Sequence, residues 1–527
     1  MSRSPGPTGS PTVTPDDLRN LDIRILDPQT AVRGSDGRAP QATAYLGDRI
    51  MISAPDLESA ERVLEAVEGI ARDLECRRVS PHPLREQEGD DRHALRVRDR
   101  RRRAEAGMPV VFDVTIGRQT LGVGRPVDVW EVVQHARASD DALIATGVGL
   151  DHVLVSAPAI SGNPFVKGLP FVKGLPFVKG LPFVKGLVGG VDSYLAAGTG
   201  GRTPVSVVLP APSPQPGARR PRVVVLDTGI GEHPWFTSGV ERTAGTSDGT
   251  IIGMDVTDPA VIDSDPEGNG GRPDAMTGEV PDDAGHGTFI AGLIRQQCPS
   301  AEIAALRVMN ADGVVPEHVL TDTLSALLVK QQEEPGWADA LVLSLGYYAE
   351  TPDDAAYTSG LKTLLVALAS RGVAVFCAAG NDSTTRPSYP AAFAVDPDFA
   401  APGTLPLASV AALNPDGSTA LFSNDGDWVT TRAAGANLVS TAPVDLLGAW
   451  QPDVAMPLDG VPTRATIGPS WFRGGFSVWS GTSFAAPVVA GAYLQALAAT
   501  APTKDNESRR GLLTPLLRAR RDPGGAR

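Results

Sequence analysis

The second half of the chain, from Arg222 to about residue 502, alternates short apolar runs with longer segments of helical periodicity. Short, nearly continuous apolar runs predict strands that are buried on both faces of a sheet. The strands are expected at 223–226, 302–309, 340–345, 373–378, 407–413 and 437–441, and the helices at 288–295, 316–334, 357–371 and 483–500. Strands and helices in alternation predict an α/β fold with a mostly parallel, doubly wound sheet.

The first half of the chain predicts a smaller α/β domain over residues 41–160. Strands are expected at 48–53 and 110–116, and helices at 57–74 and 129–138. The first of these helices has apolar residues at helical spacing: Leu57, Val63, Leu64, Val67, Ile70, Ala71 and Leu74. Residues 1–40 are rich in Pro, Gly, Ser, Asp and Thr, which predicts a disordered N-terminal segment.

Between these elements lies an arginine-rich run, DRHALRVRDRRRRAE, at residues 91–105. Such a run is compatible with a patch for nucleic acid or another acidic partner. We favour a solvated helix face or loop, because charge runs are usually solvated.

Residues 164–187 are four perfect copies of PFVKGL. Pro and Gly in each copy exclude a helix. Four copies of six residues are also too few to form the stacked core of a solenoid. Four of the seven lysines of the chain lie in this array, at Lys167, Lys173, Lys179 and Lys185. The array is interpreted as part of a Pro/Gly-rich linker over 161–221, with a docking or self-cleavage segment as the alternative. A basic C-terminal tail is expected over 503–527.

Composition narrows the choice of function. Apolar residues make up 42% of the 527 residues, enough for a large core, and the net charge of −14 argues against nucleic acid as the main partner. The longest apolar stretch, 484–499, contains Pro487, Gly491 and Gln495 and is too short to span a membrane. The N-terminus has no apolar signal region, and the three cysteines suggest no disulfide framework. We therefore expect a cytoplasmic protein without a membrane partner.

The chemistry resides in four separated motifs: LDTGIGEHP around Asp227, DDAGHGTFIAGL around His286, CAAGND around Asn381, and SGTSFAAPVVAG around Ser483. A serine hydroxyl is a weak nucleophile and needs an adjacent base. Ser483 lies at the expected start of a buried helix, where free N–H groups favour a developing oxyanion. The motifs together predict covalent acyl transfer.

Each of the other three residues has a defined role in such chemistry. His286, flanked by two glycines, has the right pKa to take the serine proton and hand it to the leaving amine. Asp227 would hold the imidazole in one tautomer and stabilise its charged form. The side-chain amide of Asn381 could donate a hydrogen bond to the oxyanion. Taken singly, Asp227 could be a turn residue and Asn381 a left-handed turn residue.

These motifs, in the order Asp, His, Ser, resemble the catalytic domain of the subtilisin-like serine proteases over residues 222–502. The resemblance implies a subtilisin-like sheet of about seven strands and a serine endopeptidase that needs no cofactor for its chemistry. It also implies that Ser344, Leu345 and Gly346 pair with an extended polypeptide substrate as an added strand, and that Ala379 and Gly380 contact it. We call Ser344–Gly346 the substrate segment.

Two insertions depart from the compact members of that family. The first, between Asp227 and His286, contains DSDPEGNGGRPD and an acidic approach at 279–283. Many family members bind structural calcium, and clustered carboxylates suit it. Because the spacing is not that of an EF-hand, we favour a solvated acidic loop without a metal site, with a structural calcium site as the alternative. The second insertion, at about 444–476, carries Trp450, Trp471 and Phe472 and is expected to shape or cover the active site.

The role of the N-terminal domain stays open between an inhibitory propeptide, which the family implies, and an accessory domain that recruits a regulatory protein, which we favour. Three alternatives to a constitutive protease also stay open: a binding protein on a protease scaffold, a latent peptide-maturation or conflict-system protease, and a non-proteolytic acyl hydrolase or ligase. Asp382, next to Asn381, suggests acceptance of a basic side chain before the cut.

Overall fold

The computed structural model describes residues 10–33, 37–119, 127–156, 194, 201–214, 216–268, 271–273, 276, 278, 280–351, 359–448, 450–458, 460–500 and 505–518 of the chain. The PFVKGL copies lie outside these residues.

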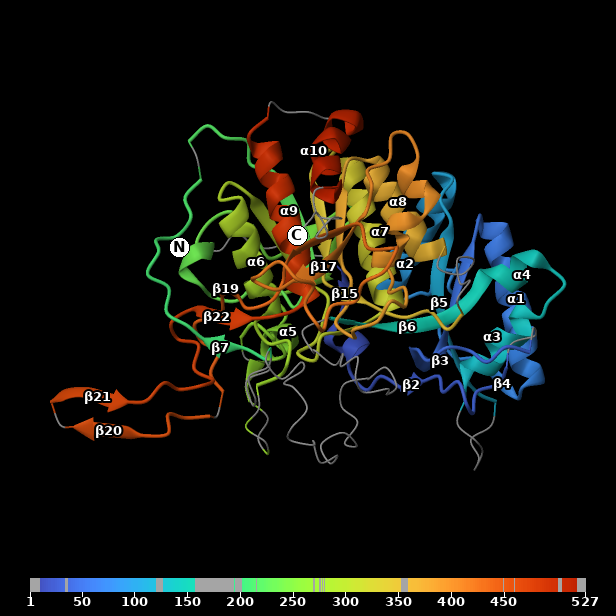
Figure 1. Ribbon diagram of the computed structural model, residues 1–527. Coiled ribbons are helices and arrows are strands. Elements are labelled where there is room, and N and C mark those ends of the chain that lie inside the picture. The colour runs from blue at the N-terminus through green and yellow to red at the C-terminus, as the bar shows by residue number, and fades with distance from the viewer. Residues whose placement is uncertain are drawn as a thin grey trace.

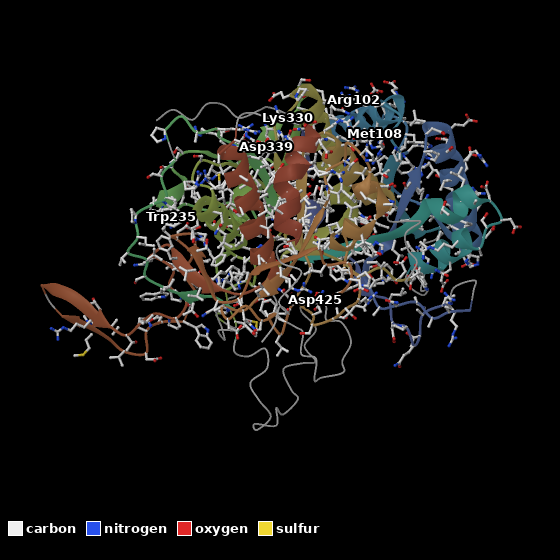
Figure 2. All side chains as sticks on the ribbon, turned by 45° about the horizontal axis from the view of Figure 1, so that its top comes forward. Arg102, Met108, Trp235, Lys330, Asp339 and Asp425 are labelled. Carbon is white, nitrogen blue, oxygen red and sulfur yellow. The ribbon has the colours of Figure 1, made fainter. Side chains whose placement is uncertain are left out.

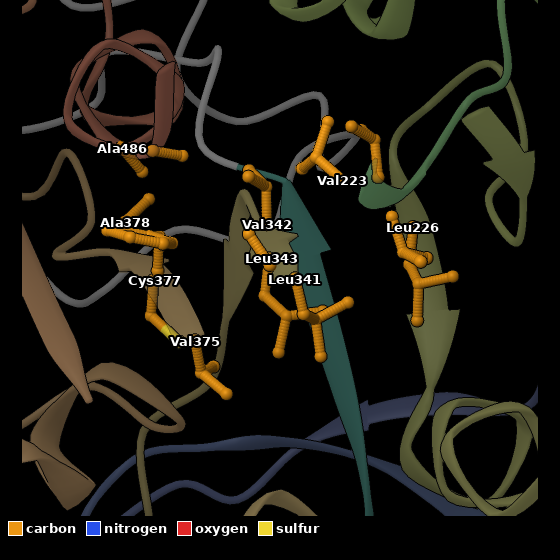
Figure 3. Packing of buried hydrophobic residues seen from close by; sticks show 14 of the residues in the cluster. Val223, Leu226, Leu341, Val342, Leu343, Val375, Cys377, Ala378 and Ala486 are labelled. Atoms are coloured by element: carbon orange, nitrogen blue, oxygen red, sulfur yellow. The ribbon is translucent and has the colours of Figure 1, made fainter. Parts of the chain in front are cut away.

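A seven-stranded sheet with the order β18-β17-β16-β14-β8-β12-β9 forms the centre of the larger part of the molecule (Figure 1), and all its pairings are parallel. Its strands are β8 (Arg222–Asp227), β9 (Val240–Glu241), β12 (Glu302–Arg307), β14 (Ala340–Leu343), β16 (Ala374–Ala378), β17 (Ala408–Leu413) and β18 (Thr431–Ala434). Figure 3 shows the apolar side chains of β14 between those of β16 and β8. The predicted fold class is confirmed.

Long helices flank this sheet. They are α6 (His286–Gln297), α7 (Glu317–Glu333), α8 (Ser359–Ser370), α9 (Thr482–Ala498) and α10 (Asn506–Arg518). Helix α9 packs on α6 and on the strands β14, β16, β17 and β18, whereas α7 packs on α8. Helix α9 is apolar nearly all round, as expected for a helix buried between a sheet and its neighbours.

The N-terminal α/β part lies at one end of the molecule (Figure 1) and has an antiparallel sheet. Its strands are β2 (Ile23–Ile25), β3 (Ala44–Ala54), β4 (Cys76–Arg78), β5 (Val110–Arg118) and β6 (Val148–Ser156), and its helices are α1 (Leu57–Asp73), α2 (Asp91–Glu105), α3 (Val129–Arg137) and α4 (Ala142–Gly147). Two strands from later in the chain, β13 (Val314–Pro316) and β15 (Leu345–Gly346), also pair with β6. We call this sheet, with β13 and β15, the N-terminal sheet.

The remaining elements are short. They are β1 (Ser10–Val13), β7 (Thr203–Pro204), β10 (Ala244–Gly245), β11 (Thr250–Met254), β19 (Leu438–Thr441), β20 (Ala455–Leu458), β21 (Val461–Ala465), β22 (Phe476–Trp479) and α5 (Pro259–Asp263), with 3-10 turns at Pro15–Leu18, Pro234–Phe236, Ala391–Val395 and Pro397–Ala400. Among the described residues, no helix has both the length and the apolar composition needed to cross a bilayer.

The prediction of a disordered N-terminal segment is wrong for residues 10–33. Strand β1 pairs in parallel with β11, and the side chains of Val13 and Leu18 are buried in the main core. The Thr12 hydroxyl lies 3.0 Å from that of Thr323 in α7. An open strand edge and two apolar anchors order a segment whose composition alone is typical of disorder.

The arginine-rich run forms α2, and only part of its charge is solvated. Arg100 and Arg103 are buried, and the Arg100 guanidinium lies 5.2 Å from the ring centre of Phe112. Arg96 forms a 2.8 Å ion pair with Asp322 of α7, and Arg92 one of 2.5 Å with Asp17. The run therefore connects the N-terminal part to α7. The expectation of a solvated helix face is wrong for these four arginines, whereas the side chains of Arg98, Arg101 and Arg102 are 59%, 49% and 41% exposed.

The expected linker and tail both contribute to the larger fold. Arg202 is buried, and β7 pairs with β22. At the other end, Leu513 of α10 is buried, and Arg509 donates to Asp339 at 2.8 Å (Figure 2 labels Asp339). A basic helix can dock where carboxylates and carbonyls accept its guanidinium groups, so residues 506–518 are not a free tail.

Candidate active site

The four predicted motifs meet where strands of the parallel sheet end and helices begin. Asp227 is the last residue of β8, and His286 is the first of α6. Asn381 follows β16, and Ser483 is the second residue of α9. All four side chains are buried. Parallel strands present their carboxyl ends at one edge, which is where open α/β sheets place their sites.

Asp227 and His286 are in direct contact. Oδ1 of Asp227 lies 2.7 Å from Nδ1 of His286 and also accepts the Thr228 N–H at 2.8 Å. Burial alone would lower the pKa of His286, but the Asp227 carboxylate outweighs it and raises that pKa. Nε2 of His286 has no hydrogen-bond partner among the described residues. This arrangement fixes the ring and leaves Nε2 for proton transfer.

Ser483 contacts the substrate segment. Its hydroxyl donates to the carbonyl of Ser344 at 3.3 Å, and the Ser344 hydroxyl donates to the carbonyl of Ser483 at 2.8 Å. The structure thus joins Ser483 to Ser344, whereas no hydrogen bond from Ser483 to His286 is found in the described part of the chain. Catalytic hydrogen bonds are often formed only when substrate is bound.

The amide of Asn381 is held by the start of α9. Its Oδ1 accepts the Thr482 N–H at 2.9 Å and the Thr482 hydroxyl at 2.8 Å, and Gly380 N–H donates to the same hydroxyl at 3.0 Å. Because Oδ1 accepts these bonds, Nδ2 is directed elsewhere as the donor end of the amide. This orientation suits the predicted donation to an oxyanion.

Sequence reasoning missed the role of Asn424. Its Nδ2 donates to the Ala379 carbonyl at 2.9 Å, and its Oδ1 accepts the Asp382 N–H at 3.0 Å. A Cβ on Gly380, whose φ is +103°, would lie 2.4 Å from that Nδ2. Asn424 therefore holds the Ala379–Asp382 segment from behind. Its signal in the sequence is that residues 422–442, among which it lies, also resemble a segment of the subtilisin-like serine proteases.

The substrate segment already has a strand beside it. In β15, Leu345 is the register partner of Ser156 and Gly346 that of Val155, in antiparallel pairing with β6. On the other side of β6, Val315 of β13 is the partner of Leu154. The added strand that was expected from a substrate is therefore supplied by the chain itself.

Asp382 takes part in a local polar cluster. The Tyr348 hydroxyl donates to its Oδ2 at 2.6 Å, and the guanidinium of Arg386 lies 4.8 Å from the Tyr348 ring centre. A basic substrate side chain would share Asp382 with Tyr348. Acceptance of such a side chain stays a prediction.

The first insertion is not simply a solvated acidic loop. Glu267 is 2% exposed and Asp283 is 0% exposed. Glu267 contacts Thr228, Gly287 and Thr288, and Asp283 accepts the Ser156 hydroxyl at 2.5 Å. The expectation of solvation is wrong for these two carboxylates, because hydroxyl and N–H groups from other segments replace water around them.

The second insertion divides into two parts. Leu446 and Phe472 are buried together with Ala284, just before His286. The hairpin β20–β21, in contrast, extends away from the body (Figure 1), and its pairing is antiparallel. The insertion therefore supports the approach to His286 at its base, and its hairpin does not cover the site.

Arg202 is a second residue that sequence reasoning missed. Its guanidinium lies 4.5 Å from the ring centre of Trp479 and donates to the carbonyls of Pro281, at 2.8 Å, and Ala284. Burial lowers the pKa of Arg202 to about 10, which leaves it charged at neutral pH. It supports the turn that precedes His286, and nothing in its Gly/Thr/Pro surroundings indicated this.

Comparison with known proteins gives a consistent result. A family model described as the subtilase family matches residues 219–519. Subtilisin E of Bacillus subtilis (strain 168) is 26% identical over 219 residues, which cover 38% of this chain and 51% of that protein. Subtilisin BL of Lederbergia lenta is 28% identical over 231 residues, covering 42% and 66%.

Two further matches are weaker: the first covers less of both chains, and the second has a low TM-score. The minor extracellular protease Epr of B. subtilis (strain 168) is 28% identical over 180 residues, 32% of this chain and 24% of that protein. A solved cold adapted subtilisin-like serine proteinase gives a TM-score of 0.34 at 20% identity, over 55% of this chain and 79% of that one. The chain spans between about a quarter and two thirds of these three relatives.

Proposed function

The chain belongs to the subtilase family, and from this premise we propose that it is a serine endopeptidase whose own N-terminal domain blocks the segment that binds substrate. The observation that carries the chemical part is the 2.7 Å contact of Asp227 with His286, at the strand end and helix start that adjoin Ser483.

The proposed reaction is a two-step hydrolysis of a peptide bond. Ser483 Oγ attacks the carbonyl carbon while Nε2 of His286 takes its proton, and Asp227 stabilises the imidazolium. Nδ2 of Asn381 and the backbone N–H of Ser483 donate to the oxyanion, each contributing roughly a hundredfold or more. His286 then protonates the leaving amine, and water hydrolyses the acyl-enzyme by the reverse proton transfers.

The blocking part rests on β6. Antiparallel pairing with β15 uses the backbone groups that an extended peptide would need, and β13 holds β6 from its other side. A substrate and β6 would therefore compete for Leu345 and Gly346. This favours the inhibitory role of the N-terminal domain over the accessory role that we preferred from sequence. It also supports a regulated peptide-processing or effector protease, activated when a partner or condition displaces β6.

A cytoplasmic location is also part of the proposal. It is supported by the three cysteines, Cys76, Cys298 and Cys377, which are buried and unpaired, because disulfides are typical of exported proteins. One matched relative is named extracellular. Fractionation of producing cells decides between the two locations, since recovery of the chain outside the cell would contradict the proposal.

The chemistry is proposed to need no cofactor, whereas structural calcium is a separate question. Among the described residues, no three His, Cys, Asp or Glu side chains gather to hold a metal. Asp274 and Glu279 lie outside those residues. If calcium stabilises the insertion, EDTA will lower the unfolding midpoint and added calcium will restore it; an unchanged midpoint would contradict calcium binding.

The test of the activity uses the full chain and a fluorophosphonate probe, with tryptic mass spectrometry to locate the adduct. We expect labelling at Ser483 that disappears in Ser483→Ala. Ser480→Ala is the matched control, because Ser480 lies three residues away and its hydroxyl accepts the Asn437 N–H at 2.8 Å.

A second probe tests the blocking. A peptidyl phosphonate must pair with the substrate segment, so we expect it to label Ser483 much more slowly than the small probe does. Cleavage of an unfolded protein should accompany labelling once β6 is displaced. Absence of labelling in the folded wild type would contradict the enzyme, and equal reactivity with both probes would contradict the blocking.

A further inference from the structure

A buried carboxyl group lies directly behind the Asp227–His286 pair. Glu267, from the first insertion, is 2% exposed. Its Oε1 accepts the Thr228 hydroxyl and the Gly287 N–H, the latter at 3.0 Å, and its Oε2 accepts the Thr288 hydroxyl. Thr228 follows Asp227, and Gly287 and Thr288 follow His286. One carboxyl group therefore contacts both motifs from a third segment of the chain.

The contacts reach the catalytic pair through Thr228. The Thr228 hydroxyl lies 3.1 Å from Oδ1 of Asp227, the oxygen that contacts His286. A hydroxyl has one proton, so Asp227 and Glu267 share this donor. The Gly287 N–H also donates to the Thr228 hydroxyl at 2.8 Å, which ties the start of α6 to the end of β8.

Thr288 completes the connection. Its hydroxyl accepts the Gly231 N–H at 2.8 Å and donates to Glu267. A Cβ on Gly287 would lie 2.1 Å from the carbonyl oxygen of Gly229. The two motifs are thus in such close contact that a small displacement of one would shift the other, and the reaction tolerates little displacement.

We propose that Glu267 is a positioning residue, which holds the Asp227 and His286 segments in register through Thr228, Gly287 and Thr288. The proposal rests on the endopeptidase function above. It gives the acidic insertion a role in the reaction geometry and does not require the insertion to touch substrate.

The protonation of Glu267 gives this role a measurable signature. Burial raises the pKa of Glu267 to about 7, against the hydrogen bonds from Thr228 and Thr288. Its negative charge in turn helps to raise the pKa of His286. The other charged groups that act on Glu267 or respond to it are Asp227, Asp265, Arg202 and Arg307. Glu267 carries this charge above about pH 7, so removing the charge lowers the pKa of His286 in that range and moves the titration of His286 to lower pH.

The experiment measures the rate of Ser483 labelling by the small fluorophosphonate probe as a function of pH, in the full chain. Glu267→Gln keeps the size of the side chain and one acceptor oxygen without the charge, and Glu267→Ala removes the charge and both acceptors. We expect Glu267→Ala to label at least about tenfold more slowly than wild type, with Glu267→Gln within about fivefold. The labelling rate falls on the acidic side of its pH profile, which we call the acidic limb. This limb should lie at lower pH in Glu267→Gln than in wild type.

Glu232→Gln is the matched control, because Glu232 is an exposed carboxylate of the neighbouring segment whose ion pair with Arg242 spans 3.9 Å. It should match wild type in rate and limb. An unmoved limb in Glu267→Gln, or a wild-type rate in folded Glu267→Ala, overturns the proposal. If Glu267→Ala does not fold, as thermal unfolding would reveal, the limb of Glu267→Gln decides. Failure of wild type to label indicates instead that the endopeptidase proposal is wrong.

Discussion

The two seven-stranded sheets of this protein make their contacts with different chemistry. The parallel sheet packs its helices through buried aliphatic side chains, some of which Figure 3 shows, and through aromatic ones such as Phe376 and Phe484. The N-terminal part meets α7 and Glu350, which lies four residues after the substrate segment, through buried charges. His152 of β6 lies 2.8 Å from both Glu317 and Glu350, and Arg137 lies 2.6 Å from Glu350. Beside them, His318 of α7 contacts Asp151 at 2.6 Å.

Because of this difference, the contacts of the parallel sheet should hardly depend on pH, whereas those of the N-terminal part should depend on it. Apolar burial depends on area and hardly on pH. A buried ion pair depends on the protonation state of each partner and leaves an uncompensated charge when one is lost. If the proposed blocking is correct, the blocking domain is attached by a contact that a change of protonation can weaken, whereas the core of the parallel sheet stays packed.

The largest expected effect tests whether Ser483, at the carboxyl edge of the parallel sheet, is the nucleophile. Ser483→Ala should lower turnover of a peptide at least about a thousandfold, because the nucleophile is lost while binding and oxyanion donors remain. Its unfolding midpoint should equal that of wild type. Ser480→Ala, in contrast, should keep turnover and lose about 1 kcal/mol of stability. Substantial turnover by Ser483→Ala would show that another residue is the nucleophile.

The next effect breaks the charged contact. Glu350→Gln should weaken docking of β6 by about 3–5 kcal/mol, because it leaves the charges of His152 and Arg137 without a full partner. The measurement is the rate of Ser483 labelling by the peptidyl phosphonate, which should rise more than a hundredfold. Glu334→Gln, at the exposed end of α7, is the control. Its side chain is 57% exposed and pairs with Lys330, so its effect should be below about 1 kcal/mol. Equal rates in the two variants would contradict the comparison.

A substitution in the apolar contact should act differently. Leu341→Ala in β14 removes a fully buried side chain and should lower the free energy of unfolding by about 2–5 kcal/mol. Denaturant unfolding at pH 6 and pH 8 should give the same loss, since no titrating group is involved. A loss of unfolding free energy that differs between pH 6 and pH 8 would contradict the view that the apolar contacts of the parallel sheet are independent of pH.

The smallest effect is the pH dependence of docking in the wild type. Burial alone would lower the pKa of His152, but Glu350 and Glu317 raise it to about 10. The stabilisation by His152 is therefore complete below its free pKa of about 6.5 and is lost as pH rises through about 10. Burial also raises the pKa of Glu317, which acts in the same direction.

Labelling by the peptidyl phosphonate should consequently rise by up to about tenfold between pH 7 and pH 8 beyond the rise of the small probe, because one proton is linked to docking. His152→Gln should remove most of this extra slope. A wild-type slope that persists in His152→Gln would assign the effect to another group, such as His318.

The sequence predicted the parts of this protein that depend on local pattern. Buried parallel strands are apolar on both faces, so β8, β14 and β16 were evident as short apolar runs, and the four motifs lay at their ends. The contact of Asp227 with His286 followed from that placement.

The parts that escaped prediction depend on partners that are distant in sequence. Glu267 lies in an insertion of acidic and glycine residues, and hydrogen bonds from Thr228, Gly287 and Thr288 of the two motifs make its burial tolerable. The arginines of α2 were assigned to solvent because Asp322 and Phe112, their partners, lie on other elements. Strand β1 is ordered by β11, far along the chain.

Strand β6 connects the two sheets mechanically. At its start, Val148 and Gly149 of β6 pair with Ile52 and Met51 of β3. A few residues later, Val155 and Ser156 of β6 pair with the substrate segment. One extended strand cannot bend sharply between these pairings without losing backbone hydrogen bonds. We therefore expect the end of β6 beside Leu345 to move together with the rest of the N-terminal sheet, as one rigid body. Opening of the site should be an all-or-none event, so a population of such molecules would contain open and closed members with few between them.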